Sequence, residues 1–302
     1  MSRIVKFLLA AIVLVAALIW FYAPARLLAI YVVGRSPVCP LANALKSDEN
    51  LRRQIAYNDQ ILKASKLLET DPAGYELWDT PHAKYWIPAG SRYVLPFNLA
   101  EQERRIYGVG EQTAKAGDVV LDCGANVGVT IRMWLDAGAG KIVAIEPAPE
   151  NILVLKRNFA AEIASGRVII YEKGVWDKEE ILTLQVDPQN SAADSFVIHR
   201  EGGKEVMKIP VTTVDKLVAE LKLDRVDFIK MDIEGAEQRA LAGARDTLAK
   251  YHPRLALASY HVPDDPEKFP QIIRAIWPGY TMECGPCAEA NGRVRPDVLY
   301  FR

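Results

Sequence analysis

Short apolar runs alternate with amphipathic segments over the second half of the chain. Continuous apolar runs are typical of buried strands, whereas apolar residues three or four positions apart are typical of helices. The runs that predict strands are 119–124, 141–147, 167–176, 226–235, 254–261 and 297–301, with 181–187 as a further candidate. Helical patterns cover 127–138, 149–162, 212–223, 236–251 and 266–279. This alternation predicts an α/β fold in which a mostly parallel sheet carries helices on both faces.

A different pattern opens the chain. Residues 7–23 are apolar and uncharged, and at about 1.5 Å per residue they approach the roughly 30 Å thickness of a bilayer core. Trp20 and Tyr22 lie near the far end of the run, where aromatic rings favour the membrane interface. A cleaved signal peptide is the alternative, because residues 23–25 resemble a small-residue cleavage site. The run is long for a signal peptide and a proline interrupts that site, so we expect an uncleaved single-pass anchor.

The segment between the anchor and the alternating region has mixed patterns. Residues 51–69 place apolar side chains near helical spacing and predict a helix. Residues 76–99 combine aromatics, prolines and short apolar runs, which favour small strands and turns, and residues 100–117 predict a helix that ends in glycines. We therefore expect three parts, which are an anchor over 1–35, a helical spacer with a small accessory segment over 36–110, and the main α/β domain over 111–302.

Composition and charge narrow the function. The net charge is −1, without the basic excess usual for nucleic-acid binding, so no nucleic-acid partner is expected. The four cysteines, Cys39, Cys123, Cys284 and Cys287, are too few for a disulfide scaffold, which favours a reducing compartment. A redox C-x-x-C motif should open a helix, but the motif at 284–287 precedes a poor helix former. A loop beside the substrate is therefore expected there, ahead of a redox pair or half of a metal site.

The stretch GDVVLDCGANVGVTIRMWL, residues 117–135, predicts a strand, a tight glycine turn and a helix. Gly124 and Gly128 allow the backbone to turn tightly and a ligand to approach it closely. The G-x-G-x-x-G pattern of a dinucleotide site is incomplete, since the third glycine is missing and Asn126 stands in place of the middle one. The turn is therefore a ligand-binding candidate of another kind.

Two acids beside this turn indicate the ligand. Asp122 ends the first strand, where a carboxylate suits a cationic or polyhydroxy ligand and repels a pyrophosphate. The second strand ends at Glu146, about 20 residues beyond the turn, and its carboxylate can accept hydrogen bonds from ribose hydroxyls. Together they favour S-adenosylmethionine, which carries a ribose and a sulfonium but no phosphate. The alternatives are a helix cap for Asp122 and a solvated strand end for Glu146.

The stretches VLDCGANVG, AIEPAPENILVLKRN, TTVDKL, VDFIKMDIEGAEQRALAGA and SYH resemble the FkbM-type S-adenosylmethionine-dependent methyltransferases, in the same order. The resemblance covers about residues 77–302, and KMDIEGAE is its most specific part. It implies the class I methyltransferase fold, with seven strands and a reversed last strand at 297–301. It also implies O-methylation, often of a sugar or polyketide hydroxyl, so a small-molecule or glycan acceptor is expected. Asparagine at position 126 is usual in this family.

Methyl transfer requires an aligned acceptor and removal of its proton. Asp232 and Glu234 point the same way if the backbone stays extended, so they are candidates to position the acceptor hydroxyl or the methionine amine of the cofactor. His261 is the best candidate for the base, and pairing with Asp264 is its alternative role. Glu237 is expected to interact with a helix dipole. Although carboxylates and imidazole are plausible metal ligands, nothing in their spacing demands an ion, so no metal is expected.

Other polar residues are weaker candidates. His199 and His252 are expected in a loop and at a helix end. Residues 190–196 predict a polar loop over the site, from which Ser195 can contact the acceptor. Their alternative role is that of a solvated loop.

Two rival functions stay open. A dinucleotide-dependent oxidoreductase uses a similar fold, but the incomplete glycine pattern argues against it. A non-catalytic S-adenosylmethionine-binding module keeps the fold without the chemistry, and the intact set of glycines and acids argues against that. S-adenosylmethionine is made in the cytosol, so a membrane-anchored enzyme is expected to face it, although the lysine and arginines on either side of the anchor do not decide the orientation.

Overall fold

A seven-stranded sheet forms the centre of the protein. The computed structural model describes residues 2–88, 90–108, 110–187, 190–198 and 204–302. The strand order is β12-β15-β11-β10-β4-β5-β6, and β15 runs antiparallel to both neighbours while the other pairs are parallel. The strands are β4 Val119–Cys123, β5 Lys141–Ile145, β6 Val168–Tyr171, β10 Phe228–Met231, β11 Arg254–Ala258, β12 Met282–Cys284 and β15 Val298–Phe301. The predicted mostly parallel sheet with a reversed last strand is confirmed.

Alternate side chains of the sheet pack against two helical layers. Leu121 and Ile229 belong to the apolar cluster shared with α9–α12, whereas Val120 and Phe228 belong to the cluster shared with α6 and α7. The helices are α6 Val129–Asp136, α7 Pro149–Asn158, α8 Ala160–Ala164, α9 Val214–Glu220, α10 Glu237–Ala242, α11 Arg245–Tyr251 and α12 Asp265–Ile276. Because successive strand residues point to opposite faces, continuous apolar runs supply both layers. The predicted helices on both faces are confirmed.

Two predicted elements are divided in the structure. The helix expected over 236–251 is two helices, because a side chain on Gly243 would lie 2.1 Å from the carbonyl oxygen of Trp176 and glycine permits this close approach. The strand expected over 167–176 ends at Tyr171, and β7 Gly174–Val175 joins a separate sheet of order β7-β9-β8. That sheet includes β8 Glu180–Val186 and β9 Lys204–Thr212. The candidate strand at 181–187 therefore exists, but outside the central sheet.

The segment before the central sheet is more varied than its pattern predicts. It comprises α3 Leu41–Ala44, α4 Ser47–Ala64, β1 Lys66–Thr70, β2 Glu76–Asp79, β3 Lys84–Ile87, η1 Ser91–Tyr93, α5 Val94–Glu103 and η2 Gly110–Gln112. The helix expected to run to residue 69 ends at Ala64, because the next residues pair with β2 as a strand. The helix expected from residue 100 instead starts at Val94, with Pro96 in its first turn, where a missing N–H costs no hydrogen bond. The small strands expected in 76–99 are present as β2 and β3.

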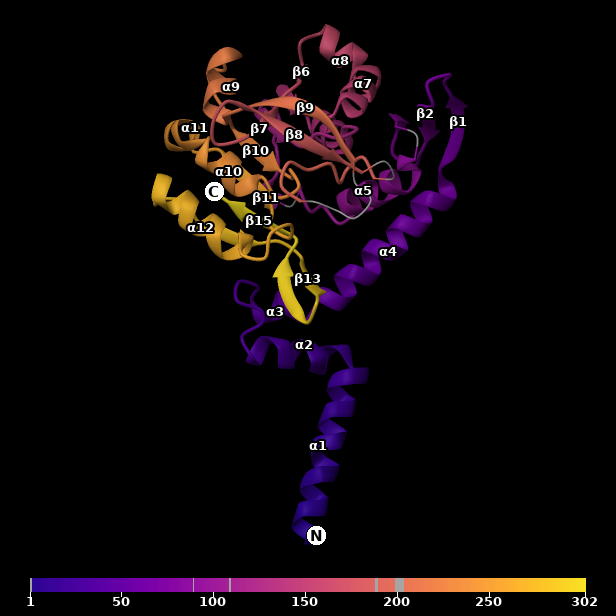
Figure 1. Ribbon diagram of the computed structural model, residues 1–302, viewed down its shortest axis with the longest axis vertical. Helices are drawn as coiled ribbons and strands as arrows, with labels where there is room; N and C mark the ends of the chain where they lie inside the picture. The colour runs from indigo at the N-terminus through magenta and orange to yellow at the C-terminus, as the bar shows by residue number, and fades with distance from the viewer. Residues whose placement is uncertain (1, 89, 109, 188–189, 199–203) are drawn as a thin grey trace.

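Helix α1, Arg3–Phe21, projects away from the rest of the protein (Figure 1). None of its residues is buried, and its length and composition suit a membrane span. A signal sequence near the N-terminus has the same length and composition. Helix α2, Ala23–Val32, turns across the end of α1 and buries Leu27 and Ile30 against the domain.

A disulfide joins the two ends of the chain. Cys39 is bonded to Cys287 in the hairpin of β13 Cys287–Ala290 and β14 Arg293–Pro296, 248 residues later in sequence. Nearby, the Arg26 side chain forms an ion pair with Glu289, and Val294 packs in the same apolar cluster as α2. The two cysteines of the C-x-x-C motif thus do not form a redox pair with each other, because Cys287 is bonded to Cys39 and Cys284 forms no disulfide. The expectation that the cysteines would all be reduced is wrong for two of them.

We predict that Cys287→Ser lowers the free energy of unfolding by about 2–4 kcal/mol, because cross-linking a long loop restricts the unfolded chain. The measurement is denaturant unfolding of the full chain in detergent without reductant. Cys284→Ser is the matched control, since this thiol forms no disulfide. Equal stability of Cys287→Ser and the parent would show that the bridge adds nothing.

Candidate active site

Two adjoining cavities lie at the carboxyl ends of the central strands. The larger has a volume of about 900 Å³ and the smaller about 50 Å³. Both are lined by Gly124, Asn126, Ala192, Asp232 and Glu234. Ligands of open α/β sheets bind at this edge, where the strand order reverses between β4 and β10. The cavities are therefore the candidate active site.

The turn after β4 is shaped by close packing. A side chain on Gly124 would lie 1.9 Å from the carbonyl oxygen of Asp232, and one on Gly128 would lie 2.1 Å from the Phe159 ring. Both glycines also have φ in the left-handed region, at +80° and +91°. Gly128 lines neither cavity, and its packing against Phe159 accounts for the glycine, while its contact with the cofactor stays a prediction. Gly124 borders both cavities, as the sequence predicts.

Asn126 explains why this turn does without a middle glycine. Its φ is +49°, a region that asparagine tolerates better than most residues. The side-chain amide donates a hydrogen bond to the Ser191 carbonyl oxygen at 3.1 Å, so the turn holds the loop over the site. The Asn126 N–H points the other way and donates to a Glu146 carboxylate oxygen at 2.8 Å.

Glu146 ends β5 at the smaller cavity and is buried. Its carboxylate also accepts from the Ala148 N–H at 3.0 Å and from the Asn151 amide at 3.4 Å. A carboxylate offers about four acceptor positions, so capacity remains for a ligand hydroxyl. Burial raises the pKa of Glu146 to about 7, against the opposing effect of these hydrogen bonds. The alternative of a solvated strand end is therefore not what the structure has.

Asp122 lies behind the cavities, not in them. It is fully buried, its carboxylate accepts from the Thr130 hydroxyl at 2.6 Å, and the Lys230 ammonium lies 3.1 Å from its other oxygen. Lys230 lines the larger cavity and donates to the Gly124 carbonyl oxygen at 2.7 Å. The ion pair thus fixes the glycine turn from below. Asp122 lines neither cavity, because Lys230 and Thr130 contact its oxygens from behind the wall, and its expected contact with the cofactor stays a prediction.

The turn after β10 carries the second set of acids. Glu234 has φ of +55° and is followed by Gly235 at +94°, so the chain leaves the extended conformation directly after the strand. Glu237 is fully buried, and its two oxygens accept from the Ile233 N–H at 2.8 Å and the Gly235 N–H at 3.0 Å. Its role is therefore to hold this turn, where the sequence predicted only a helix-dipole interaction.

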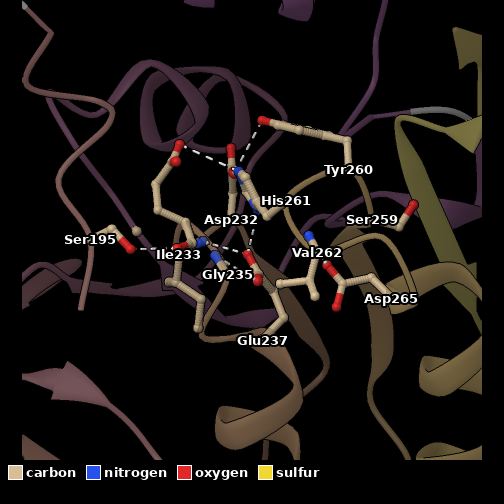
Figure 2. Close-up of polar contacts among 12 residues, drawn as sticks. Ser195, Asp232, Ile233, Gly235, Glu237, Ser259, Tyr260, His261, Val262 and Asp265 are labelled. Carbon is tan, nitrogen blue, oxygen red and sulfur yellow. Dashed lines mark hydrogen bonds and ion pairs between the residues drawn. The ribbon is translucent and has the colours of Figure 1, made fainter. Parts of the chain in front are cut away.

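His261 follows β11 and meets three carboxylates (Figure 2). Its Nδ1 lies 2.9 Å from a Glu237 oxygen, and its Nε2 lies 3.3 Å from Glu234 and 3.5 Å from Asp232. Burial by itself lowers the pKa of His261, but these carboxylates outweigh it and hold the pKa well above its usual value. The predicted trio of Asp232, Glu234 and His261 is thus brought together, and the alternative pairing of His261 with Asp264 is not observed among its described contacts.

Two tyrosines complete the surroundings of Asp232. The Tyr107 hydroxyl donates to one carboxylate oxygen at 2.9 Å, and the Tyr260 hydroxyl donates to the other at 3.3 Å. Tyr107 and Tyr260 both line the larger cavity with His261. The structure therefore places hydroxyl donors, carboxylates and an imidazole around one point of the cavity wall.

Several residues of the site escape sequence reasoning. Lys230 and Tyr107 contact other residues of the site, and only the lysine interrupting an apolar strand gave a local signal. Asp194 lines the smaller cavity with one buried oxygen that makes no hydrogen bond, and burial raises its pKa to about 8. The adjacent Ser195 lines neither cavity, since its hydroxyl donates to the Glu234 carbonyl oxygen at 2.6 Å.

The remaining histidine candidates lie elsewhere. His252 caps α11 and stacks on Trp277 with ring centroids 3.9 Å apart, away from both cavities. His199 lies outside the residues that the structure describes.

With this geometry, the sequence can be compared with known proteins. The methyltransferase FkbM domain family matches residues 122–285, which is more than half of the chain. The chain belongs to this family, and the resemblance found in its motifs is confirmed. The match begins at the end of β4 and includes the turns after β4 and β10, so the family region contains Glu146, Asp232 and Glu234.

Individual relatives are distant. Methyltransferase sdnD of Sordaria araneosa is 30% identical over 154 residues, covering 41% of this chain and 59% of its own length. The 31-O-demethyl-FK506 methyltransferase FkbM of Streptomyces tacrolimicus is 26% identical over 159 residues, covering 44% of this chain and 61% of its own. The crystal structure of methyltransferase FkbM from Methylobacillus flagellatus has 19% identity and a TM-score of 0.48, covering 85% of this chain and 60% of that one. The chain thus spans about three fifths of the length of these proteins.

We predict that Lys230→Met lowers the free energy of unfolding by about 3–5 kcal/mol, because it leaves the Asp122 carboxylate buried without its cation. Adding Asp122→Asn should recover most of this loss. The measurement is a double-mutant cycle by denaturant unfolding. Strictly additive losses would show that the two side chains do not depend on each other.

Proposed function

We propose that the protein transfers a methyl group from S-adenosylmethionine to a hydroxyl oxygen of a sugar, glycan or secondary metabolite. The observation that supports this most directly is that the two cavities share lining residues. It places the buried acid Glu146 in the smaller cavity and the Asp232, Glu234 and His261 cluster in the larger, with shared walls. Cofactor and acceptor can therefore meet at the ends of β4 and β10.

The residues that line the smaller cavity offer partners for the nucleoside part of the cofactor. Glu146 accepts a ribose hydroxyl with its remaining capacity, and the unpaired oxygen of Asp194 suits the adenine amine. Val175 and Phe196 supply apolar contacts for the base. Gly124 leaves the backbone open to the ligand beside these groups.

The larger cavity fits an acceptor hydroxyl beside Asp232. The Asp232 side chain is 20% exposed, whereas that of His261 is 3% exposed, so an acceptor reaches the carboxylate first. Asp232 then accepts a hydrogen bond from the acceptor hydroxyl. The charged side chains of His261 and Glu234 lie beside this carboxylate. S-adenosylmethionine supplies the activated methyl group when bound. The residues of this chain align the acceptor and accept its proton.

The rim of the larger cavity favours a ring-shaped, hydroxylated acceptor. Tyr93 and Phe97 line it with 59% and 47% of their surface exposed, and Asn98 and Gln102 add polar groups beside them. Aromatic faces stack on the apolar side of a sugar ring while amides bond its hydroxyls. The relative from Streptomyces is named for methylating an oxygen of 31-O-demethyl-FK506, which agrees with oxygen as the target atom.

We also propose that α1 anchors the protein in a membrane and that the catalytic domain faces the cytosol, where the cofactor is made. The disulfide argues in the other direction, because such bonds are uncommon in reducing compartments. A reporter fused to the C-terminus decides between the two. Reporter activity only outside the cytosol would exclude the cytosolic arrangement.

We predict that S-adenosylmethionine binds the full chain in detergent and that Glu146→Gln weakens this binding by about tenfold or more, the cost of losing a hydrogen bond to a charged group. Calorimetric titration measures it. Glu172→Gln is the matched control, since it removes an equal charge from the surface near β6. Absence of binding to folded protein, or tighter binding of a nicotinamide dinucleotide, would exclude the proposed function, and binding without methyl transfer to any hydroxylated acceptor would favour the non-catalytic module.

The affinity for S-adenosylmethionine should fall as the pH is lowered through about 7, the raised pKa of Glu146. Below this pKa the carboxyl is protonated and loses both its charge and an acceptor position. A group that must be ionised changes the binding constant about tenfold per pH unit below its pKa. Titrations at several pH values measure the effect, and Glu146→Gln should flatten the profile whereas the surface variant Glu172→Gln should retain it. An unchanged slope in Glu146→Gln would assign the effect to another group.

A further inference from the structure

Three potential ligand atoms meet where two neighbouring strands end. Asp232 and Glu234 follow β10, and His261 follows β11. Their ligand atoms all lie within 4.8 Å of one another (Figure 2). The distances from His261 Nε2 are 3.3 Å to Glu234 and 3.5 Å to Asp232. Parallel pairing of β10 with β11 makes this meeting a consequence of the fold.

The imidazole of His261 is buried and held with one nitrogen directed between the carboxylates. Its side chain is 3% exposed, and Nε2 makes no hydrogen bond despite its two acidic neighbours. Nδ1 is occupied by Glu237, which two backbone N–H groups fix in turn. A cation bound at Nε2 would displace the proton from that nitrogen and leave the remaining hydrogen on Nδ1, so the Nε2 lone pair would face the cation beside Asp232 and Glu234. A carboxylate on the far nitrogen is the usual support of a metal-binding histidine.

We propose that Asp232, Glu234 and His261 bind a divalent cation. Ligands about 2.1 Å from a metal are about 3.0 Å apart in octahedral and about 3.4 Å apart in tetrahedral geometry, which the two Nε2 distances approach. Two carboxylate oxygens and one imidazole nitrogen suit Mn²⁺, Mg²⁺ or Zn²⁺. The cluster of three ligands offers an incomplete coordination shell, so positions remain open towards the cavity.

The charge around the cluster favours a cation. Three carboxylates, those of Asp232, Glu234 and Glu237, surround one imidazole. Among the described residues that line the larger cavity, Lys230 is the other basic side chain, and it is paired with Asp122. A divalent ion would offset this excess of negative charge. The tyrosine hydroxyls on Asp232 stabilise its carboxylate but carry no positive charge.

This inference rests on the proposed function for its consequence in catalysis. An acceptor hydroxyl bound at an open position of the cation is acidified, as metal-bound water is. Its proton leaves through the cavity to solvent as the bond between the acceptor oxygen and the methyl carbon forms and the bond between that carbon and sulfur breaks. The cation would thus help the acidic wall of the cavity to bind and deprotonate the acceptor hydroxyl.

Titration of the full chain in detergent with Mn²⁺ tests the site, with free Mn²⁺ followed by its electron paramagnetic resonance signal. We expect about one site per chain, weakened about tenfold or more in Glu234→Gln and in His261→Gln. Glu237→Gln should weaken binding less than loss of a ligand, since it only orients the imidazole. Asp187→Asn removes an acid from the same cavity outside the cluster and should bind as the parent does.

Two further readouts keep the test decisive if a variant folds poorly. Nitrogen hyperfine coupling to the bound Mn²⁺ in the parent is expected from the imidazole of His261, and Mn²⁺ should raise the Tm of the parent but not of Glu234→Gln. No loss of free Mn²⁺, or equal binding by parent and ligand variants, would overturn the site. S-adenosylmethionine binding without Mn²⁺ binding would overturn this inference alone, whereas Mn²⁺ binding without cofactor binding would overturn the proposed function alone.

Discussion

The contact between Gly124 and the Asp232 carbonyl oxygen determines how close the two halves of the site can be. The turn after β4 passes directly over the end of β10, where a side chain on Gly124 would lie 1.9 Å from that oxygen. Any residue but glycine must push the strands apart or distort one turn. Because the strands stay together, the wall bearing Glu146 and the wall bearing Asp232 enclose adjoining cavities. The distance between the groups proposed to bind the cofactor and those proposed to bind the acceptor is therefore determined by the backbone at Gly124.

Buried charges hold both turns from beneath. Lys230 links Asp122 to the Gly124 carbonyl, and Glu237 joins two backbone N–H groups to His261. Burying such charges is unfavourable unless each has partners, and each of these has them. Their positions suggest why charged residues are used in place of apolar ones, since an apolar side chain cannot fix a carbonyl, an N–H or an imidazole. The buried charges of Lys230 and Glu237 thus fix the orientation of the groups around the cavity.

The N-terminal part is bound to the domain at several points and does not act as a free tether. The Gln54 amide on α4 donates to the Phe97 carbonyl oxygen on α5, and Asn50 donates to the Cys287 carbonyl oxygen in the hairpin. The disulfide from Cys39 adds a covalent link to the same hairpin. Because α5 supplies the rim of the larger cavity, the segment expected as a spacer also builds the entrance to the site.

The sequence by itself determined the alternation of strands and helices, the glycine turn and the acids at strand ends, because burial on both faces and tight turns restrict residue choice locally. It also placed Asp232, Glu234 and His261 at one edge, since parallel strands end together. Only the tertiary structure decided that Asp122 is a buried partner of Lys230, that Glu237 orients His261, and that Cys39 meets Cys287. These pairings join residues distant in the chain, so their geometry depends on how the elements pack and leaves no local pattern.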